Sequence, residues 1–451
     1  MLHALKEHVG NRLIQQGDTQ YEELRKVWNG AIDKHPLAII VCESEQDVVA
    51  AVKFANKNNL SISIRGGGHH LAGLAVCDDG LMIDLSNMRN VQVDEQRRVA
   101  LVQGGATLAD VDGETQKYGL ATPTGTVSET GIAGLALAGG MGYLRGKYGL
   151  TSDNIVGVNI VTAEGELLHA NQESNPDLFW AVRGGGGNFG VVTSFEFQLH
   201  PVGPEVLGID VMYDFDDAKE VVVKAQEYLR HSSDDVSFNL TVMQLPPAPF
   251  LPEFLHNKKV VAVSGMYAGD AEQGLQEIQP LRELAKPIVD QTGKIPFVEL
   301  QKKLDPMVQN HIPVYGTSLY FSELTEEVMD ILINKIENAP TPAILVQLWA
   351  LGGEMNRISP AKTPFAIRDA QFILLVDAMA MNGEEELCQK WVDSIYSGML
   401  SYSYKKSSYL NAMEVDDEVT KSAYQENYNR LLEIKKKYDP RNLFRHNHNI
   451  K

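Results

Sequence analysis

Short apolar runs alternate with amphipathic stretches along the first 200 residues. Apolar runs too short for a helix predict strands at residues 36–42, 60–64, 81–85, 91–93, 99–102 and 191–197. Residues 44–47 supply helix N-cap side chains before an amphipathic segment at 48–55, and helical spacing recurs at 108–118 and 177–182. This part of the chain is therefore predicted to be an α+β domain.

The pattern changes near Pro201, where glycine becomes rare and the apolar runs become longer. Strands are predicted at 206–212, 236–243, 260–267, 343–349 and 372–379, and helices at 217–229, 271–284, 325–336 and 384–399. Four prolines within residues 245–252 predict an exposed loop. One amphipathic helix is predicted at 419–438, ended by Asp439-Pro440. Long strands covered by helices would account for this region.

Composition and charge exclude several classes of protein. Among the 451 residues, 44% are hydrophobic and 22% charged, which excludes a disordered or collagen-like chain. No apolar run reaches the ~20 residues that cross a bilayer, and the first residues form neither a secretory signal nor a transit peptide. A net charge of −19 argues against nucleic acid and membrane surfaces as partners.

Cysteine and histidine spacing argues against metal and disulfide chemistry. Cys42, Cys77 and Cys388 are scattered and form no CxxC, so neither a disulfide framework nor a zinc site is expected, and a reducing cytoplasm fits better. His69 and His70 have no HExxH-like partner, so no metal is expected. A histidine with a purely structural hydrogen bond is the alternative for this pair.

Glycine gathers in three clusters, at residues 65–70, 125–149 and 183–190. A lone glycine usually marks a tight turn, but three clusters in one domain suggest backbone amides close to a large phosphate-bearing ligand. Residues 185–190 satisfy GxGxxG, yet a helix-like stretch precedes them and a strand follows, so a Rossmann site is rejected. A GxxxxGK[ST] loop is absent from the sequence.

These motifs resemble those of the FAD-linked oxidases with a vanillyl-alcohol-oxidase (PCMH-type) flavin domain, specifically the berberine-bridge-enzyme-like group. The resemblance rests on Arg-Gly-Gly-Gly-His at 65–69 and on segments 123–134, 139–149, 177–190 and 427–450. It implies a two-part FAD-binding domain formed by residues 1–200 and 405–451. A substrate domain at 201–404 would be inserted between them, with an antiparallel sheet covered by helices.

The resemblance also implies the residues around the cofactor. His69 would be covalently linked to the flavin 8α-methyl carbon, and the three glycines before it would cradle the pyrophosphate. The implied FAD-binding residues are Arg65, Gly66, Gly67, Gly68, His69, His70, Gly73, Pro123, Thr124, Gly125, Val127, Thr130, Gly131, Gly134, Gly140, Gly142, Gly190, Val192, Asn447 and Asn449.

Three positions bear on how this sequence compares with relatives. Many relatives carry a cysteine where Val127 stands, and valine forms no thioether, so a single covalent link is expected. Gly125 resembles the small residue that leaves room for dioxygen beside the flavin. Ala412 replaces a tyrosine that serves relatives as a proton relay. The reserve catalytic candidates are Tyr143, Tyr409 and His70, and packing is the preferred role of Tyr148.

The leading hypothesis is a cytoplasmic FAD-dependent oxidase, in which the resemblance implies the flavin chemistry and the scattered cysteines favour the compartment. A small-molecule alcohol, sugar or amine would lose hydride from an activated C–H, and dioxygen would reoxidise the flavin. A dehydrogenase with another acceptor, and a flavin-fold protein with a structural or binding role, are the alternatives. Gln347, Trp349 and Arg368 are predicted to line the substrate site.

Overall fold

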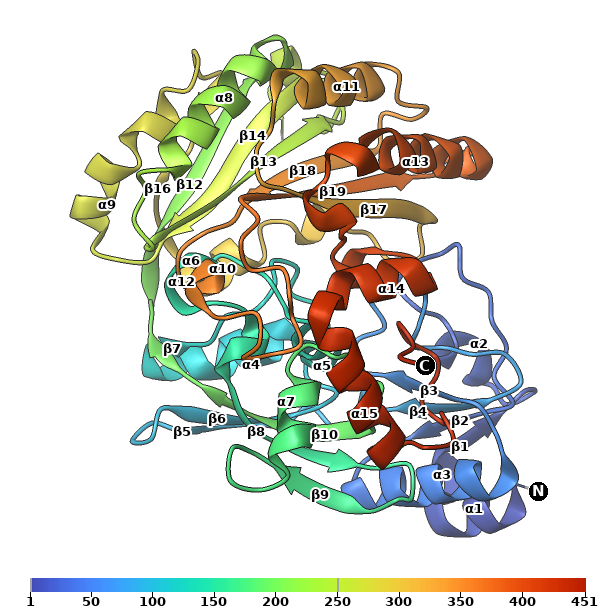
Figure 1. Ribbon diagram of the computed structural model, residues 1–451. Coiled ribbons are helices and arrows are strands. Elements are labelled where there is room, and N and C mark those ends of the chain that lie inside the picture. Colours follow the sequence, from blue (N-terminus) through green and yellow to red (C-terminus); the bar gives the residue numbers. More distant parts are fainter. Residues whose placement is uncertain (1, 250) are drawn as a thin grey trace.

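The structure of the protein is a computed structural model that describes residues 2–249 and 251–451. Figure 1 shows a lower half, which contains both chain ends, and an upper half, which is one large sheet with helices on its outer face. The arrangement is α+β, as the sequence pattern predicts.

A mixed four-stranded sheet lies near the N-terminus. Its elements are β1 (Leu13–Gln15), β2 (Ala38–Val41), β3 (Ile62–Arg65) and β4 (Leu81–Asp84), with helices α1 (His3–Val9), α2 (Tyr21–Leu24) and α3 (Glu45–Asn58). The strand order is β1-β2-β4-β3, and β4 pairs in parallel with both β2 and β3. Ser44 caps α3, because its hydroxyl accepts a hydrogen bond from the Asp47 amide.

An antiparallel five-stranded sheet completes the strand-rich part of the lower half. Its order is given by β5 (Val91–Asp94), β6 (Val99–Gln103), β10 (Val191–Gln198), β8 (Ile155–Val161) and β9 (Leu167–Ala170). A two-stranded pair, β7 (Leu120–Ala121) with β11 (His200–Pro201), lies beside it. The helices of this region are α4 (Leu108–Thr115), α5 (Ile132–Leu137), α6 (Arg145–Tyr148) and α7 (Pro176–Val182).

The upper half is an eight-stranded antiparallel sheet. Its strands are β12 (Glu205–Asp214), β13 (Val236–Gln244), β14 (Lys259–Tyr267), β15 (Val289–Asp290), β16 (Gly293–Pro296), β17 (Val314–Phe321), β18 (Ile344–Ala350) and β19 (Phe372–Met379). The order is β15-β12-β14-β13-β18-β19-β17, with β16 also paired to β12.

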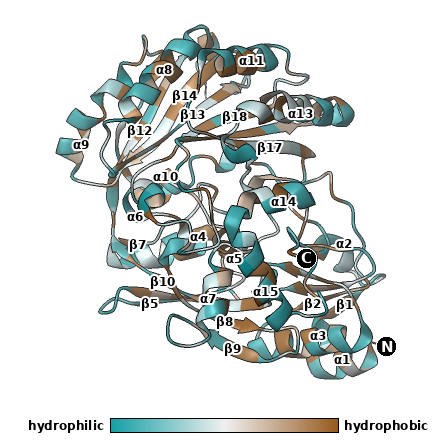
Figure 2. Ribbon diagram, in the orientation of Figure 1, coloured by the Kyte–Doolittle hydropathy of each residue, from teal (hydrophilic) through white to brown (hydrophobic). Residues whose placement is uncertain are grey.

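Helices cover the outer face of the upper sheet. The helices of this half are α8 (Ala218–Leu229), α9 (Ala271–Glu277), α10 (Phe297–Gln301), α11 (Glu326–Glu337), α12 (Glu354–Arg357) and α13 (Glu385–Met399). Figure 1 shows α8, α11 and α13 on the side away from the lower half. In Figure 2 the strands beneath them are hydrophobic and the outward helix surfaces are hydrophilic. The inner face of the sheet is thus directed toward the lower half.

The chain returns to the lower half after residue 404. Helices α14 (Asp417–Tyr424) and α15 (Tyr428–Tyr438) pack there, and Leu431 and Ile434 share a core with Trp180 and Phe195. A separate core under the outer helices draws only on residues between Leu207 and Met399. Burying apolar side chains is the main stabilising term in folding, so each half has its own source of stability.

Three expectations from the sequence differ from the structure. The helix expected at 419–438 is interrupted at Gln425, whose φ of 48° is incompatible with a continuous helix. The helix expected at 271–284 ends at Glu277, because Pro280 cannot continue it and lies near the start of a separate 3₁₀ turn at Gln279–Arg282. Strands β8 and β17 have no counterpart in the expectations, since neither shows a clear alternation of polar and apolar residues.

In the loop at 245–252, Leu245 is buried, the prolines are exposed, and residue 250 lies outside the described residues.

Candidate active site

The main cavity of the described part of the chain lies where the two halves meet. Its volume is about 400 Å³, within the range of small-molecule sites. The lower half contributes glycine-rich backbone and the C-terminal segment, and the upper half contributes the inner face of β13, β18 and β19. The sequence-predicted residues that line it are Gly66, Gly67, Gly68, His69, His70, Gly125, Val127, Thr130, Gly131, Gly134, Gly190, Val192, Tyr409 and Asn447.

The first glycine cluster follows directly from β3. Arg65 ends this strand and forms an ion pair with Asp84 at the end of β4, with 3.0 Å between Nε and Oδ1. Its Nη1 donates to the Leu24 carbonyl at 2.6 Å. The Arg65 side chain therefore fixes the start of the loop and does not line the cavity.

Two glycine segments press their backbones together at the cavity wall. A Cβ on Gly67 would lie 2.3 Å from the Gly131 nitrogen, and one on Gly131 would lie 2.2 Å from the Gly67 nitrogen. Any side chain at either position would push the two loops apart, since such contacts are far below van der Waals distance. Glycine here brings the 66–68 loop against the start of α5.

Other predicted cofactor residues lie behind this wall. A Cβ on Gly142 would lie 1.8 Å from the Thr124 carbonyl oxygen, and Gly140 (φ 81°) packs in the same way against Thr151. Gly73 has a φ of 59° and lies against Ile32. The predicted residues that do not line the cavity are Arg65, Gly73, Pro123, Thr124, Gly140, Gly142 and Asn449.

His69 faces an aromatic neighbour that sequence reasoning missed. The Trp28 ring stacks on the His69 imidazole with 5.6 Å between ring centroids and 15° between planes, and both residues line the cavity. Burial lowers the pKa of His69 to about 4, because the charged form loses its hydration. His69 is therefore a neutral imidazole at physiological pH.

His70 is fully engaged by hydrogen bonds. The Ala72 amide donates to Nδ1 at 3.1 Å, so the proton of the neutral ring lies on Nε2, which is 3.0 Å from the Leu410 carbonyl oxygen. Burial lowers the pKa of His70 to about 4. With its one lone pair already used by Ala72, His70 is poorly suited to take a proton from a substrate.

The two tyrosine candidates differ in position. Tyr143 does not line the cavity; it is buried in a cluster with Leu144, Val202 and Met266. Tyr409 does line the cavity, and its hydroxyl accepts a hydrogen bond from Asn411 at 2.8 Å. Burial raises the pKa of each phenol to about 12, so neither hydroxyl is a base near neutral pH.

Residues near the C-terminus close part of the cavity. Lys435 holds this segment, because its ammonium group contacts Asp439 at 2.7 Å and the carbonyls of Asn188 and Phe444 at 2.8 Å. The Asn447 Oδ1 atom lacks a hydrogen-bond partner among the described residues although it is buried at the cavity. An unpartnered buried polar atom is costly, so Asn447 is suited to bind a polar ligand.

Besides Val314 of β17, the inner face of the upper sheet contributes alternate residues of three strands. They are Thr241 of β13, Leu345, Gln347 and Trp349 of β18, and Leu375, Asp377 and Met379 of β19. Gln347 and Trp349, which the sequence predicts to line the substrate site, thus both line this cavity. Asp377 is missed by the sequence reasoning, although an acid within the apolar run of β19 was a usable signal.

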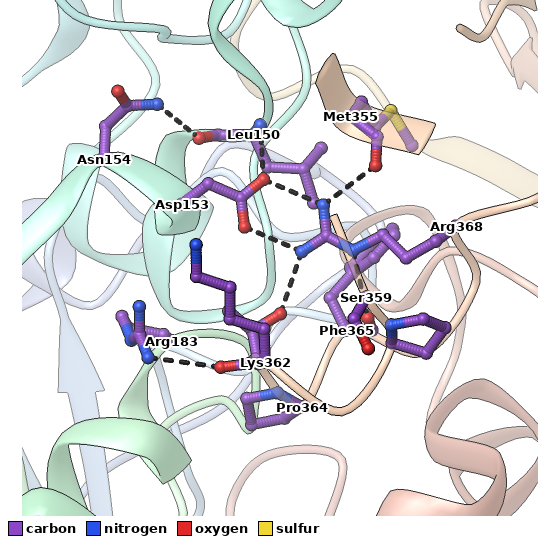
Figure 3. Close-up of polar contacts among 12 residues, drawn as sticks. Leu150, Asp153, Asn154, Arg183, Met355, Ser359, Lys362, Pro364, Phe365 and Arg368 are labelled. Atoms are coloured by element: carbon purple, nitrogen blue, oxygen red, sulfur yellow. Dashed lines mark hydrogen bonds and ion pairs between the residues drawn. The ribbon is translucent and has the colours of Figure 1, made fainter. Parts of the chain in front are cut away.

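Arg368 does not line the cavity, and the prediction that it does is wrong. Its guanidinium is fully buried and forms a two-pronged contact with Asp153, at 2.8 and 2.7 Å. It also donates to Thr363 and to the carbonyls of Met355 and Phe365. Figure 3 shows this arrangement, in which Arg368 of the upper half faces the loop after α6. Its role is to join the two halves.

The cavity wall also contains glycines that protein packing does not require. A Cβ on Gly134, within α5, would meet nothing within 4 Å, and one on Gly187 would reach only Asn447, at 4.0 Å. Glycine inside a helix costs about 1 kcal/mol relative to alanine, so its use at Gly134 indicates close approach of a ligand. Backbone walls of this kind suit a long cofactor such as FAD.

The described residues contain neither a metal-binding cluster nor a helix suited to span a membrane. No group of three or more histidine, cysteine or acidic side chains is arranged to hold a metal ion. Among the same residues, no helix combines the length and apolar character needed to cross a bilayer.

Comparisons with known proteins agree with this geometry. Residues 36–171 match a family model described as FAD binding domain, and residues 408–451 match one described as berberine and berberine like. An FAD-linked oxidoreductase of Dictyostelium discoideum is 32% identical over 99% of this chain and 95% of its own length. The (R)-6-hydroxynicotine oxidase of Paenarthrobacter nicotinovorans is 29% identical over 98% of this chain and 97% of its own length.

A solved structure extends the comparison to the whole fold. The 6-hydroxy-D-nicotine oxidase from Arthrobacter nicotinovorans is similar with a TM-score of 0.88 and 28% identity, over 98% of each chain. The two proteins therefore share their fold along nearly the full length of each chain.

Proposed function

The chain belongs to the FAD-linked oxidoreductases with a berberine-like C-terminal segment, and on this basis we propose that it is an oxidase with FAD attached covalently through His69. The observation that supports this most is the single cavity that carries His69, the glycine wall and the inner face of the upper sheet together. In this proposal, residues 1–200 and 405–451 form the flavin domain, and residues 201–404 form the substrate domain.

When bound, FAD would supply the redox chemistry, which is hydride uptake from a substrate carbon and transfer of the electrons to an acceptor. His69 holds the cofactor: its neutral imidazole has a free nitrogen lone pair, and stacking on Trp28 fixes the plane of the ring. Val127 lines the cavity and offers no thiol, so the link is single.

Proton transfer is assigned to the upper half of the cavity. Burial raises the pKa of Asp377 to about 7, so its carboxyl group can accept a proton near neutral pH. The substrate loses the proton of its O–H or N–H group to this carboxyl when the adjacent carbon loses hydride. Gln347 and Trp349 position the substrate beside it.

Dioxygen is the proposed electron acceptor, and Gly125 is the residue that gives it room. We expect protein reduced by a turned-over substrate to recover its oxidised absorption in air and to release hydrogen peroxide, one molecule per flavin. The same solution under nitrogen is the control. Persistence of the reduced spectrum in air, together with fast reoxidation by a quinone, would instead identify a dehydrogenase.

A glycine in α5 tests whether the cavity binds FAD. Gly134→Ala is expected to stabilise the cofactor-free protein by up to about 1 kcal/mol, because alanine favours the helix, and to reduce flavin content. The matched control is Gly113→Ala in α4. A Cβ there also meets nothing within 4 Å, and this exposed position lies away from the cavity. Gly113→Ala should retain full flavin content. Full flavin content in Gly134→Ala would contradict this placement of the cofactor.

A further inference from the structure

One carboxylate faces the cavity without a partner. Asp377 is the only acidic side chain among the described residues that line the cavity, and no lysine or arginine lines it. In the register of the sheet, its neighbours are Gly316 on β17 and Leu345 on β18. Neither can donate a side-chain hydrogen bond, and desolvation is the sole influence on the Asp377 pKa. A positively charged partner would stabilise the ionised form of a desolvated carboxyl group of this kind.

Gly316 keeps the carboxyl group open to the cavity. A Cβ at this position would lie 2.6 Å from Asp377 Oδ1 and 3.2 Å from Leu71 Cδ2. It would also lie 2.9 Å from the Val376 carbonyl oxygen. The φ of Gly316 is not in the left-handed region, so close packing rather than backbone conformation requires glycine here.

The surfaces around Asp377 are mainly apolar. They are contributed by Leu304, Met307 and Val308 before β17, by Val314 and Leu345, and by Leu375 and Met379 on either side of Asp377. The polar exceptions, Gln347 and Thr241, are 3.4 Å apart and hydrogen-bond to each other. A sugar with many hydroxyl groups would leave most of them unpaired against these surfaces, at a cost for each.

We propose that the substrate is a compact apolar molecule with one cationic nitrogen, which forms an ion pair with Asp377. This rests on the proposed function, because it names the substrate class for the same cavity. The apolar surfaces bind the hydrocarbon part, and the carboxylate selects the charge. The net charge of −19 also favours the approach of a cation over that of an anion.

The ion pair has a defined pH dependence. Burial raises the pKa of Asp377 to about 7, so the carboxylate is present above that pH and lost as the pH falls below it. The histidines and tyrosines that line the cavity add no charge near pH 7. Burial lowers the pKa of His69 and His70 to about 4 and that of His448 to about 3, and it also lowers the pKa of His446. Burial raises the pKa values of Tyr409 and Tyr424. Affinity for a cation should therefore rise up to about tenfold per pH unit below 7 and level off above it.

Calorimetric binding to the FAD-loaded protein, with the flavin reduced and under nitrogen, tests this without turnover of a substrate, because reduced flavin cannot accept a hydride. The probes are N-methylbenzylammonium, its neutral isostere benzyl methyl ether, and cellobiose. We expect the cation to bind at least about 30-fold more tightly than the ether, and Asp377→Asn to remove this preference. Gly316→Ala is a second variant, which should weaken cation binding through the crowded carboxyl group. Flavin content shows that each variant is folded.

The outcomes separate the two proposals. Equal or tighter binding of the ether or cellobiose, no binding of the cation, or an unchanged preference in Asp377→Asn would overturn the cation site and leave the oxidase proposal intact. Cation binding that depends on Asp377, in a protein that yields no peroxide with any reducing substrate, would overturn the oxidase proposal alone.

Discussion

His69→Ala should abolish covalent flavin attachment while the protein remains folded. The neutral His69 imidazole is the nitrogen nucleophile proposed to form the covalent bond to the flavin. Alanine has no side-chain atom that can form this bond. The Gly67–Gly131 contact does not involve the imidazole, so the cavity wall should persist and bind FAD reversibly. After acid precipitation, the yellow colour should move from the pellet, where wild-type protein holds it, to the supernatant.

A neighbouring variant provides the matched control. His70→Gln retains groups that can accept from Ala72 and donate to Leu410, and it leaves His69 in place. It should keep its flavin in the acid pellet. Flavin that stays with denatured His69→Ala, or is lost from His70→Gln alone, would show that His69 is not the attachment site.

Arg368→Ala should cause the largest loss of stability. The substitution leaves the Asp153 carboxylate buried, with the Leu150 amide, at 2.8 Å, as its remaining hydrogen-bond donor. Breaking a buried ion pair by removing one partner costs about 3–5 kcal/mol. The free energy of unfolding, measured by urea denaturation at matched flavin content, should fall by that amount.

An exposed pair in the same half serves as the comparison. Arg357 contacts Asp234 and Glu354 with its side chain 54% exposed, so Arg357→Ala should cost about 1 kcal/mol or less. Asp153→Asn removes the charge with little change in shape and should also destabilise strongly, because it leaves the Arg368 cation buried. Similar, small effects of Arg368→Ala and Arg357→Ala would contradict the structural role assigned to Arg368.

The sequence predicts the lower wall of the cavity well because glycine spacing is a local signal. Gly66 to His69 follow a strand whose pattern is clear, and the Gly67–Gly131 contact needs only two glycine segments. Asp377 escapes prediction because its exposure to the cavity depends on the pairing of β17, β18 and β19 and on Gly316 opposite. Arg368 is misplaced because its partner, Asp153, is 215 residues away along the chain.

Among the helices too, those with a local sequence signal are predictable and those set by tertiary packing are not. Outer helices such as α13 are predictable, since one face is apolar and the other polar along their whole length. The break at Gln425 is not, because a polar residue in the left-handed region has no strong sequence signal and is imposed by how α14 and α15 pack. Tertiary packing therefore decides what local preference leaves undetermined.

The dependence of the lower core on α15 sets an order for biosynthesis. A ribosome releases residues 1–200 long before Leu431 and Ile434, which share a core with Trp180 and Phe195. The upper core uses only residues up to Met399, so the later-made half can mature first. The cavity-lining residues Phe444 and His446 to His448 emerge later still. During translation the nascent N-terminal segment thus remains incomplete and a natural client for chaperones, and cofactor loading follows synthesis of the C-terminal segment.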